Sequence, residues 1–257
     1  MLAGAGLFVF FVAPLAGLVE RAPWHQFVSD LTDSVTRDAL RLSLECSLAA
    51  TALSVLLGVP IAWVLARTEF PGRSVVRALA LLPMVLPPVV GGVALLQAFG
   101  RPGLVGQYLD RWFGITLAFS TAGVIMAETF VAMPFLVITV DGALRSLDTR
   151  YEDAGATLGA SRWTVMRRVT LPAIAPSLAA GAALTWARAL GEFGATITFA
   201  GNLPRTTQTM PLAVYVAFQE EPGTAIVLSL VLLAVSITVL AVVGRRVFAN
   251  RAALAPT

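Results

Sequence analysis

The sequence of 257 residues lacks lysine altogether, because its 18 basic residues are all arginines. A Walker A phosphate loop requires a lysine, as does Schiff-base chemistry, so ATP hydrolysis by that route and pyridoxal-type catalysis are excluded. Only one histidine, His25, and one cysteine, Cys46, are present, which excludes a His/Cys metal cluster. We expect Cys46 to be an inert buried thiol. We predict no metal site, no cofactor and no enzymatic activity of the chain's own.

Charge is also scarce. Charged residues make up 13% of the chain, against roughly 25% in soluble domains, while 57% of the residues are hydrophobic and the mean hydropathy is +0.81. A water-soluble core of this length could not bury so much apolar surface. We therefore predict an all-α membrane protein that forms one transmembrane domain over residues 1–257. The isoelectric point of about 9.7 reflects arginines beside membrane helices, and we predict no nucleic-acid partner.

Six apolar runs are long enough to cross a hydrocarbon core, which needs roughly 20 residues per helix. They cover residues 2–19, 41–66, 76–99, 115–140, 173–200 and 224–247. The first run could instead be a cleaved signal peptide, but it lacks a positively charged start and is longer than the apolar part of such peptides. We interpret it as a retained helix, and so predict about six transmembrane helices.

The distribution of arginine predicts the orientation, because cytoplasmic loops of membrane proteins carry an excess of basic residues. Segments 67–77 and 141–172 and the C-terminal tail hold three, five and three arginines, against six in the segments on the opposite side. Arg21, which follows the first run, is the local exception. We predict that both termini and 141–172 are cytoplasmic and that 201–222 is extracytoplasmic.

The segment 148–172, between the fourth and fifth runs, is too polar to span a membrane. Thr149 with Glu152 three residues later forms a capping-box pattern, which predicts a helix start. Gly159 suits the left-handed position that ends a helix. Ser161 can cap a second short helix, which we expect to end at the Leu-Pro pair before the fifth run. The sequence thus predicts two short helices joined by a glycine turn on the cytoplasmic face.

This segment resembles the EAA loop of ABC-importer permeases. The matching residues are Glu152, Asp153, Ala154, Gly155 and Gly159, followed by Leu171 and Pro172. Asp153 replaces the alanine usual in the family, a mild change near a helix N-terminus where acidic residues are favoured. The resemblance implies a coupling helix that docks on a cytoplasmic ATPase subunit. The alternative is an amphipathic connector without a partner.

A second resemblance concerns the cargo. Three stretches are similar to molybdate/tungstate permeases, namely Gly191–Thr196, Ala200–Asn202 and Thr207–Thr209. Sulfate/thiosulfate permeases are related but tend to read Gly-Glu-Tyr-Gly-Ser in the first stretch. Phe193 and Thr196 therefore favour molybdate or tungstate, and sulfate is the alternative.

Charges and helix breaks inside the apolar runs are candidates for a translocation path or gate. Arg188 and Glu192 lie one helical turn apart, and we predict that they pair; the pair either fixes helix packing or belongs to a gate. Glu45 and Glu128 raise the same question. A carboxylate repels an oxyanion, so hydroxyl groups and helix N-termini are better ligands. The candidate path or gate residues are Glu192, Phe193, Gly194, Thr196, Thr198, Pro87 and Pro88. Ordinary proline kinking is the alternative for the last two.

The resemblance implies an assembly in a bacterial inner membrane. Its partners would be a cytoplasmic ABC ATPase dimer, an extracytoplasmic oxyanion-binding protein, a second copy of this chain and the lipid bilayer. Two other classes of protein are weighed against this prediction. A secondary transporter would need internal repeats and a coupling-ion site at mid-membrane. No internal repeat is evident, and the segment 148–172 would go unexplained. A membrane enzyme would need a nucleophile, a base or a metal cluster, which the residue inventory nearly forbids.

Overall fold

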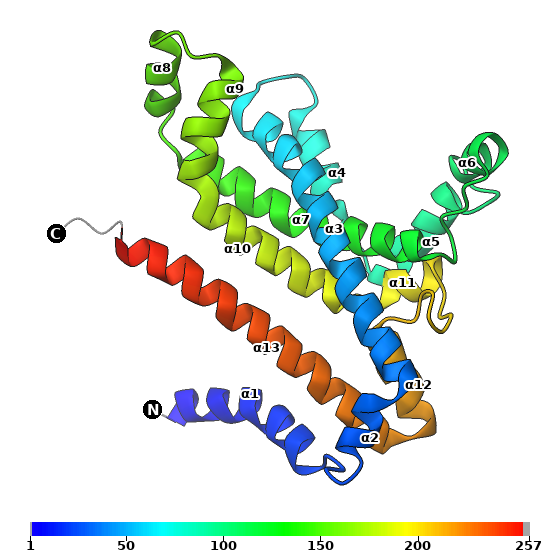
Figure 1. The fold of residues 1–257 in the computed structure, drawn as a ribbon. Coiled ribbons are helices and arrows are strands. Elements are labelled where there is room, and N and C mark those ends of the chain that lie inside the picture. Colours follow the sequence, from blue (N-terminus) through cyan, green and yellow to red (C-terminus); the bar gives the residue numbers. More distant parts are fainter. Residues whose placement is uncertain (1, 254–257) are drawn as a thin grey trace.

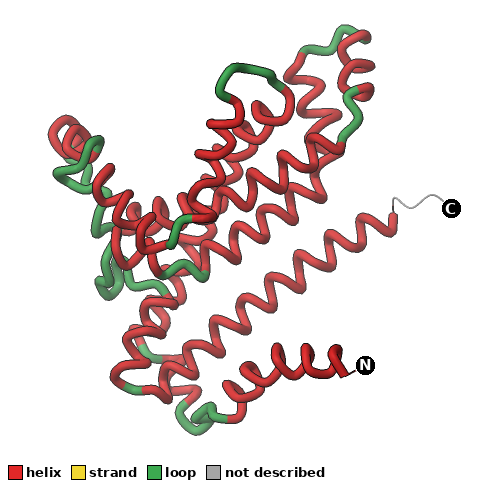
Figure 2. The backbone as a smooth tube through the Cα atoms, turned by 180° about the vertical axis from the view of Figure 1, so that it is seen from behind, coloured by secondary structure: helices red, strands yellow, loops and turns green. Residues whose placement is uncertain are grey.

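The computed structural model describes residues 2–253, and all regular elements in that range are helices (Figures 1 and 2). They are α1 (Leu2–Glu20), α2 (Phe27–Thr32), α3 (Ser34–Arg67), α4 (Arg73–Val85), α5 (Pro88–Phe99), α6 (Gly106–Phe113), α7 (Thr121–Ser146), α8 (Arg150–Thr157), α9 (Arg162–Val165), the π-helical turn η1 (Met166–Thr170), α10 (Leu171–Leu190), α11 (Gly194–Phe199), α12 (Met210–Glu220) and α13 (Pro222–Ala253). The chain ends, for which a cytoplasmic position was predicted, lie outside the described residues.

The apolar runs form helices, as predicted. Within residues 2–253, four straight segments are long and apolar enough to cross a membrane: α3, α7, residues 162–190 and residues 222–239. A bent pair, α4 with α5, makes a fifth candidate, and residues 6–20 of α1 form a shorter apolar stretch. The chain is therefore an all-α membrane protein with several spans.

Two of the predicted runs are not continuous helices. The run 76–99 bends by 119° between α4 and α5, where Pro87 and Pro88 follow each other. Proline lacks a backbone N–H, and it disfavours the helical conformation for the residue before it, so α4 cannot continue through the pair. The run 173–200 breaks at Gly191, where α10 ends and α11 starts three residues later.

The core forms where α3, α7 and α10 pack together, with small residues at the closest contacts. A Cβ at Gly58 of α3 would lie 3.3 Å from Leu136 of α7, and a Cβ at Gly181 of α10 would lie 3.1 Å from Thr139. Close approach of this kind is how membrane helices associate, because lipid tails give no hydrophobic drive to helix pairing. Cys46 is fully buried in α3, as expected.

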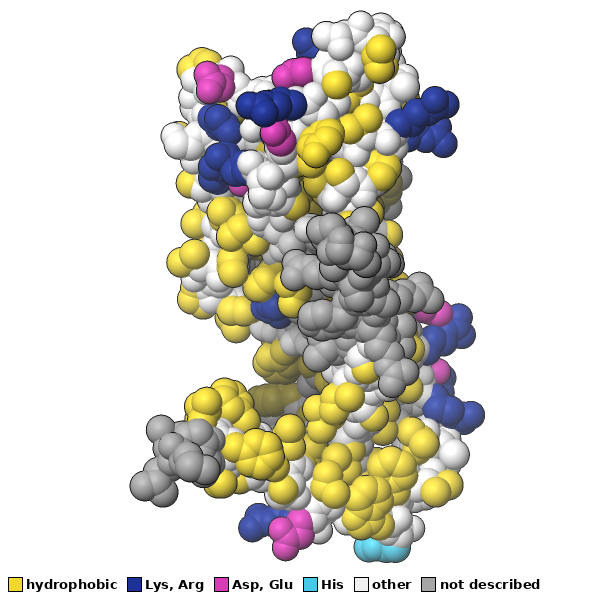
Figure 3. All heavy atoms as spheres, turned by 90° about the vertical axis from the view of Figure 1, so that its left-hand side faces the viewer, with side chains coloured by type: hydrophobic (Ala, Val, Ile, Leu, Met, Phe, Trp, Pro, Cys, Tyr) yellow, Lys and Arg dark blue, Asp and Glu magenta, His cyan; other side chains and the backbone are white. Residues whose placement is uncertain are grey.

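The outer surface is strongly apolar. On α1, which packs against α13, Phe8 is 68% and Phe10 is 72% exposed. In water each square ångström of such surface would cost about 25 cal/mol, so lipid is the solvent that these side chains fit. Figure 3 shows arginine and acidic side chains at the upper end of the molecule and again in its lower half, with hydrophobic side chains between them.

The predicted cytoplasmic segments lie at one end of the helix bundle. α8, α9 and the connection between α3 and α4 are neighbours there, while α2 and α12 lie toward the opposite end (Figure 1). Segments 67–77 and 141–172 are thus on the same side of the bundle. The arrangement places the segment with the EAA-like signature beside the end of α3.

Candidate functional site

α8 begins differently from the prediction. Thr149 has helical backbone angles, φ −63° and ψ −20°, and its side chain caps nothing. Asp148 provides the cap instead, because its Oδ1 accepts the N–H of Arg150 at 3.0 Å. The predicted capping box is therefore wrong, and the physical reason is that the carboxylate of Glu152 is bound elsewhere.

Glu152 anchors α8 to two other elements. Its Oε2 lies 3.1 Å from Nε of Arg67 at the end of α3, and its Oε1 accepts Nη2 of the same arginine at 3.1 Å. Oε1 also accepts the hydroxyl of Thr170 in η1 at 2.9 Å. The side chains of Arg67 and Glu152 are only 12% and 20% exposed. Glu152 thus faces the interior of the helix bundle, and sequence reasoning found neither of its partners.

The two glycines of the signature fit the predicted turn. Gly159 has φ +79°, so the left-handed conformation that stops α8 is confirmed. A Cβ at Gly155 would lie 3.0 Å from Val165 of α9, which explains why α8 and α9 can pack so closely. Ser161 caps α9 as predicted, since its hydroxyl accepts the N–H of Thr164 at 3.2 Å.

The second short helix does not end at Leu171 and Pro172, which corrects the prediction. α9 passes through η1 directly into α10, and Pro172 lies in the first turn of α10. Proline is tolerated there because the first N–H groups of a helix need no intrahelical partner. The segment therefore connects without a break to a membrane-spanning helix.

The outward surface of this segment carries apolar groups. Tyr151, Leu158 and Trp163 are 64%, 88% and 66% exposed. Asp153 and Ala154, two residues of the signature, are also exposed. A short, capped helix with exposed apolar side chains on an otherwise polar segment is suited to docking into a cleft of another protein.

The predicted ion pair is confirmed, although its setting is different. Nη2 of Arg188 lies 2.6 Å from Oε2 of Glu192, whose side chain is 1% exposed. α10 ends at Leu190, so Glu192 is not on the same helix as Arg188, contrary to the prediction. Its Oε1 accepts the N–H of Ala195 at 2.7 Å and so caps α11. Glu192 joins the end of one helix to the start of the next.

The two helix breaks meet in space. A Cβ at Gly194 in α11 would lie 2.9 Å from Cβ of Pro88 in α5, and a Cβ at Gly92 would lie 2.8 Å from the carbonyl oxygen of Ala195. The structure therefore brings Pro88 of α5 into contact with Gly194, the first residue of α11, which also carries the hydroxyl groups of Thr196 and Thr198. Pro87 directly precedes α5. The contact has no room for a side chain on either glycine.

The candidate path residues differ in their exposure. Phe193 packs against Tyr215 with ring centroids 5.2 Å apart and ring planes tilted by 56°. Both line an apolar groove of about 780 Å³ between α1, α12, α13 and the connection from α10 to α11. Thr196 is fully buried and its hydroxyl has no partner among the described residues. The hydroxyl of Thr198 donates to the carbonyl of Gly194 at 2.8 Å. Phe193 and Thr198 are both half-buried, so of these three only Thr196 is closed off from the surface.

Two further carboxylates have separate surroundings. Glu45 is exposed and pairs with Arg41 at 2.6 Å. Glu128 is 1% exposed, and within residues 2–253 one of its carboxylate oxygens has no hydrogen-bond partner. Neither residue contacts the groove beside Phe193.

Comparison with known proteins assigns the chain to a family. Residues 54–253 match the sequence profile of the family described as binding-protein-dependent transport system inner membrane component. A molybdenum transport system permease protein of Mycobacterium tuberculosis (strain ATCC 25618 / H37Rv) is 50% identical over 240 residues, which are 93% of this chain and 90% of that protein. A sulfate transport system permease protein of Escherichia coli (strain K12) is 36% identical over 231 residues, 88% and 83% of the two chains.

The fold comparison agrees. A bacterial ABC transporter involved in the import of the acidic polysaccharide alginate superposes with a TM-score of 0.72 at 19% identity, over 95% of this chain and 94% of that one. This chain belongs to the family of binding-protein-dependent transport system inner membrane components.

Proposed function

We propose that this chain is the permease subunit of an ATP-driven importer that moves molybdate or tungstate across a bacterial inner membrane. The observation that carries the proposal is its identity to a molybdenum permease over nearly its whole length, which exceeds its identity to a sulfate permease. Phe193 and Thr196 support the same choice. Sulfate is the second candidate, favoured by the relationship to the sulfate permease.

The α8–α9 segment is proposed as the surface that docks on a separate ATPase dimer. Glu152 and Gly155 hold α8 rigidly, Gly159 ends it, and exposed residues from Tyr151 to Trp163 present an apolar surface. Asp153 and Ala154 lie on this exposed surface. ATP hydrolysis is assigned to the partner because this chain has no lysine for a Walker loop. Movement of the ATPase would reach the membrane through the unbroken α9–α10 connection.

The translocation path is proposed to run beside the break at residues 191–194. The break exposes Phe193 to the apolar groove and sets α11 against α5. Non-helical backbone inside a membrane is tolerated where it is buried in protein or lines a cavity. A second copy of this chain is proposed to complete the path. An extracytoplasmic oxyanion-binding protein would supply the cargo and most of the selectivity.

Uptake by the reconstituted complex tests the function. Proteoliposomes that contain the permease, its ATPase and its binding protein are expected to accumulate labelled molybdate when ATP is enclosed with the ATPase. Liposomes with a non-hydrolysable ATP analogue are the control. Equal accumulation in both would contradict an ATP-driven importer.

Orientation is tested by thiol labelling. On a Cys46→Ala background, single cysteines at Thr164 in α9 and at Thr206 between α11 and α12 should differ in reaction with a membrane-impermeant maleimide. In intact cells Thr206→Cys is expected to react and Thr164→Cys is not, because 141–172 is proposed to be cytoplasmic. After permeabilisation both should react. The reverse pattern in intact cells would invert the proposed topology.

A further inference from the structure

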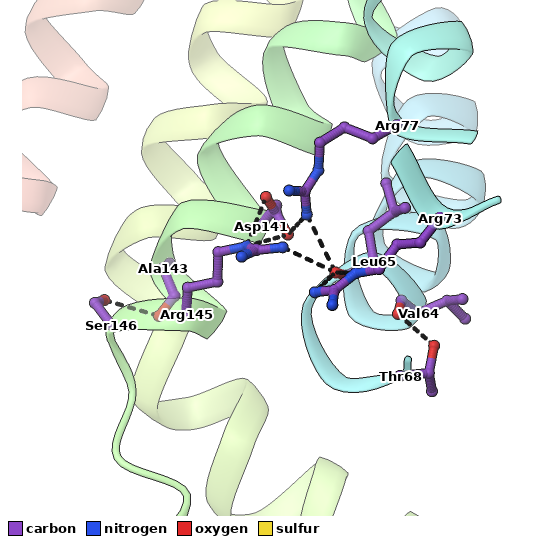
Figure 4. Close-up of polar contacts among 9 residues, drawn as sticks. All are labelled: Val64, Leu65, Thr68, Arg73, Arg77, Asp141, Ala143, Arg145 and Ser146. Atoms are coloured by element: carbon purple, nitrogen blue, oxygen red, sulfur yellow. Dashed lines mark hydrogen bonds and ion pairs between the residues drawn. The ribbon is translucent and has the colours of Figure 1, made fainter. Parts of the chain in front are cut away.

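Three arginines converge on one backbone oxygen at the end of α3, close to α8 (Figure 4). The carbonyl oxygen of Leu65 accepts Nε of Arg73 at 2.9 Å, Nη2 of Arg77 at 3.2 Å and Nη2 of Arg145 at 3.1 Å. The arginines come from α4 and α7, so the cluster connects the ends of three helices. We call Arg73, Arg77 and Arg145 the guanidinium cluster.

The guanidinium cluster provides more hydrogen-bond donors than the carbonyl groups at the end of α3 can accept. The last carbonyls of a helix are unpaired, and a cation beside them is favourable, but a carbonyl oxygen has only two lone pairs. Leu65 accepts four guanidinium N–H groups, because Nη2 of Arg73 donates as well. Several donors on the three arginines consequently have no acceptor among the described side chains.

The charges do not balance either. Asp141 is the one acidic residue, in the described chain, that contacts these arginines: its Oδ1 lies 3.1 Å from Nη2 of Arg77 and 3.0 Å from Nε of Arg145. Three cations face one carboxylate, which leaves an excess of two positive charges. Like charges so close together are stabilised by an additional anion.

The guanidinium cluster is open to the surroundings of the protein. The side chains of Arg77 and Arg145 are 33% and 41% exposed. On α4, the same helix that carries Arg77, the apolar residues Val75 and Leu79 are 59% and 61% exposed. The positive group thus lies beside apolar surface at the end of a membrane helix, which is the level of lipid headgroups.

We propose that the guanidinium cluster binds a tetrahedral oxyanion group, supplied by the phosphodiester of an anionic phospholipid. Guanidinium groups offer paired donors that match phosphate oxygens, and basic pockets between membrane helices bind lipid headgroups. The acyl chains would lie on the exposed residues of α4. The site is separate from the groove at Phe193 and goes beyond the proposed transport function. Free phosphate or molybdate shares this chemistry and is the other possible source.

Lipid retention by the full chain tests the site. Purified protein is exchanged into detergent with equal amounts of phosphatidylglycerol and phosphatidylcholine, and bound lipid is counted by native mass spectrometry. The wild-type chain is expected to prefer phosphatidylglycerol, and the Arg73→Gln/Arg77→Gln variant to lose that preference by on the order of tenfold. Arg101→Gln/Arg111→Gln removes the same charge from α6 and the loop before it, and should retain the preference. If the double variant does not fold, Arg77→Gln alone is measured instead, and its preference for phosphatidylglycerol is expected to fall about threefold.

A second arm separates the two sources of the anion. In nanodiscs of phosphatidylcholine alone, the thermal unfolding midpoint is measured with and without inorganic phosphate, and with and without molybdate. One outcome would assign the site to a free oxyanion instead of a lipid. In it, phosphate or molybdate stabilises the wild-type chain but not Arg73→Gln/Arg77→Gln, and the first arm shows no lipid preference. Equal lipid preference in all variants together with no anion effect would overturn the proposal, while leaving the transport assignment untouched.

Discussion

Glu152→Arg is expected to reduce ATP-dependent uptake by about tenfold or more while leaving the permease in the membrane. In the wild-type chain Glu152 binds Arg67 and Thr170, and the pair with Arg67 is mostly buried. The variant places two guanidinium groups against each other at that position, and a lone or repelled buried charge costs several kcal/mol. α8 would then lose its fixed position relative to α3, and force from the ATPase would not reach the membrane helices.

The charge swap is the decisive comparison. Arg67→Glu alone is expected to fail as Glu152→Arg does, whereas the double change Arg67→Glu/Glu152→Arg should recover a substantial part of uptake. Asp153→Asn, at the exposed neighbour, is the control for charge loss on α8 and should change uptake less than Glu152→Arg. Uptake and co-purification of the ATPase are measured on the same preparation. Full activity of Glu152→Arg, or no recovery in the swap, would mean that this pair does not position α8.

Arg188→Ala is expected to lower the thermal unfolding midpoint more than the double change Arg188→Ala/Glu192→Gln does. The single change leaves the carboxylate of Glu192, 1% exposed, without its cation, and an unpaired buried charge costs roughly 3–5 kcal/mol. Glutamine removes the charge but keeps an oxygen that can accept the N–H of Ala195. The cap of α11 would therefore survive in the double variant.

A matched comparison separates pairing from packing. Glu192→Ala removes both the ion pair and the cap, and should be worse than Glu192→Gln. Midpoints are measured by fluorescence-detected unfolding in detergent for the single and double variants. If the losses in Arg188→Ala and Glu192→Gln simply add in the double variant, the two side chains are not coupled and the pair has no structural role.

The sequence predicts those features that depend on local pattern. Apolar runs of about 20 residues locate the helices, Gly159 locates the left-handed turn, and Ser161 locates a helix cap. The spacing of Arg188 and Glu192 was sufficient to predict their ion pair. Each of these depends on residues that lie close together in the sequence.

The features that sequence reasoning missed depend on contacts between distant segments. Arg67 is 85 positions from Glu152, and this contact withdraws the carboxylate that the local pattern assigned to a cap with Thr149. The close approach of α11 to α5, where Pro88 lies against Gly194, is a second contact of this kind. The guanidinium cluster combines three helix ends. The hydrophobic pattern of a single segment does not predict such contacts, because they depend on how distant segments pack together.

The proposed function of this chain is the import of molybdate or tungstate with energy from a partner ATPase. The most direct test measures ATP hydrolysis by the reconstituted permease–ATPase complex in the presence of its cognate binding protein. Hydrolysis should rise when the binding protein is loaded with molybdate or tungstate, and should stay at the basal rate with sulfate alone. Stimulation by micromolar sulfate, with molybdate and tungstate inert, would contradict the assigned cargo, and no stimulation by any of the three would contradict the importer itself.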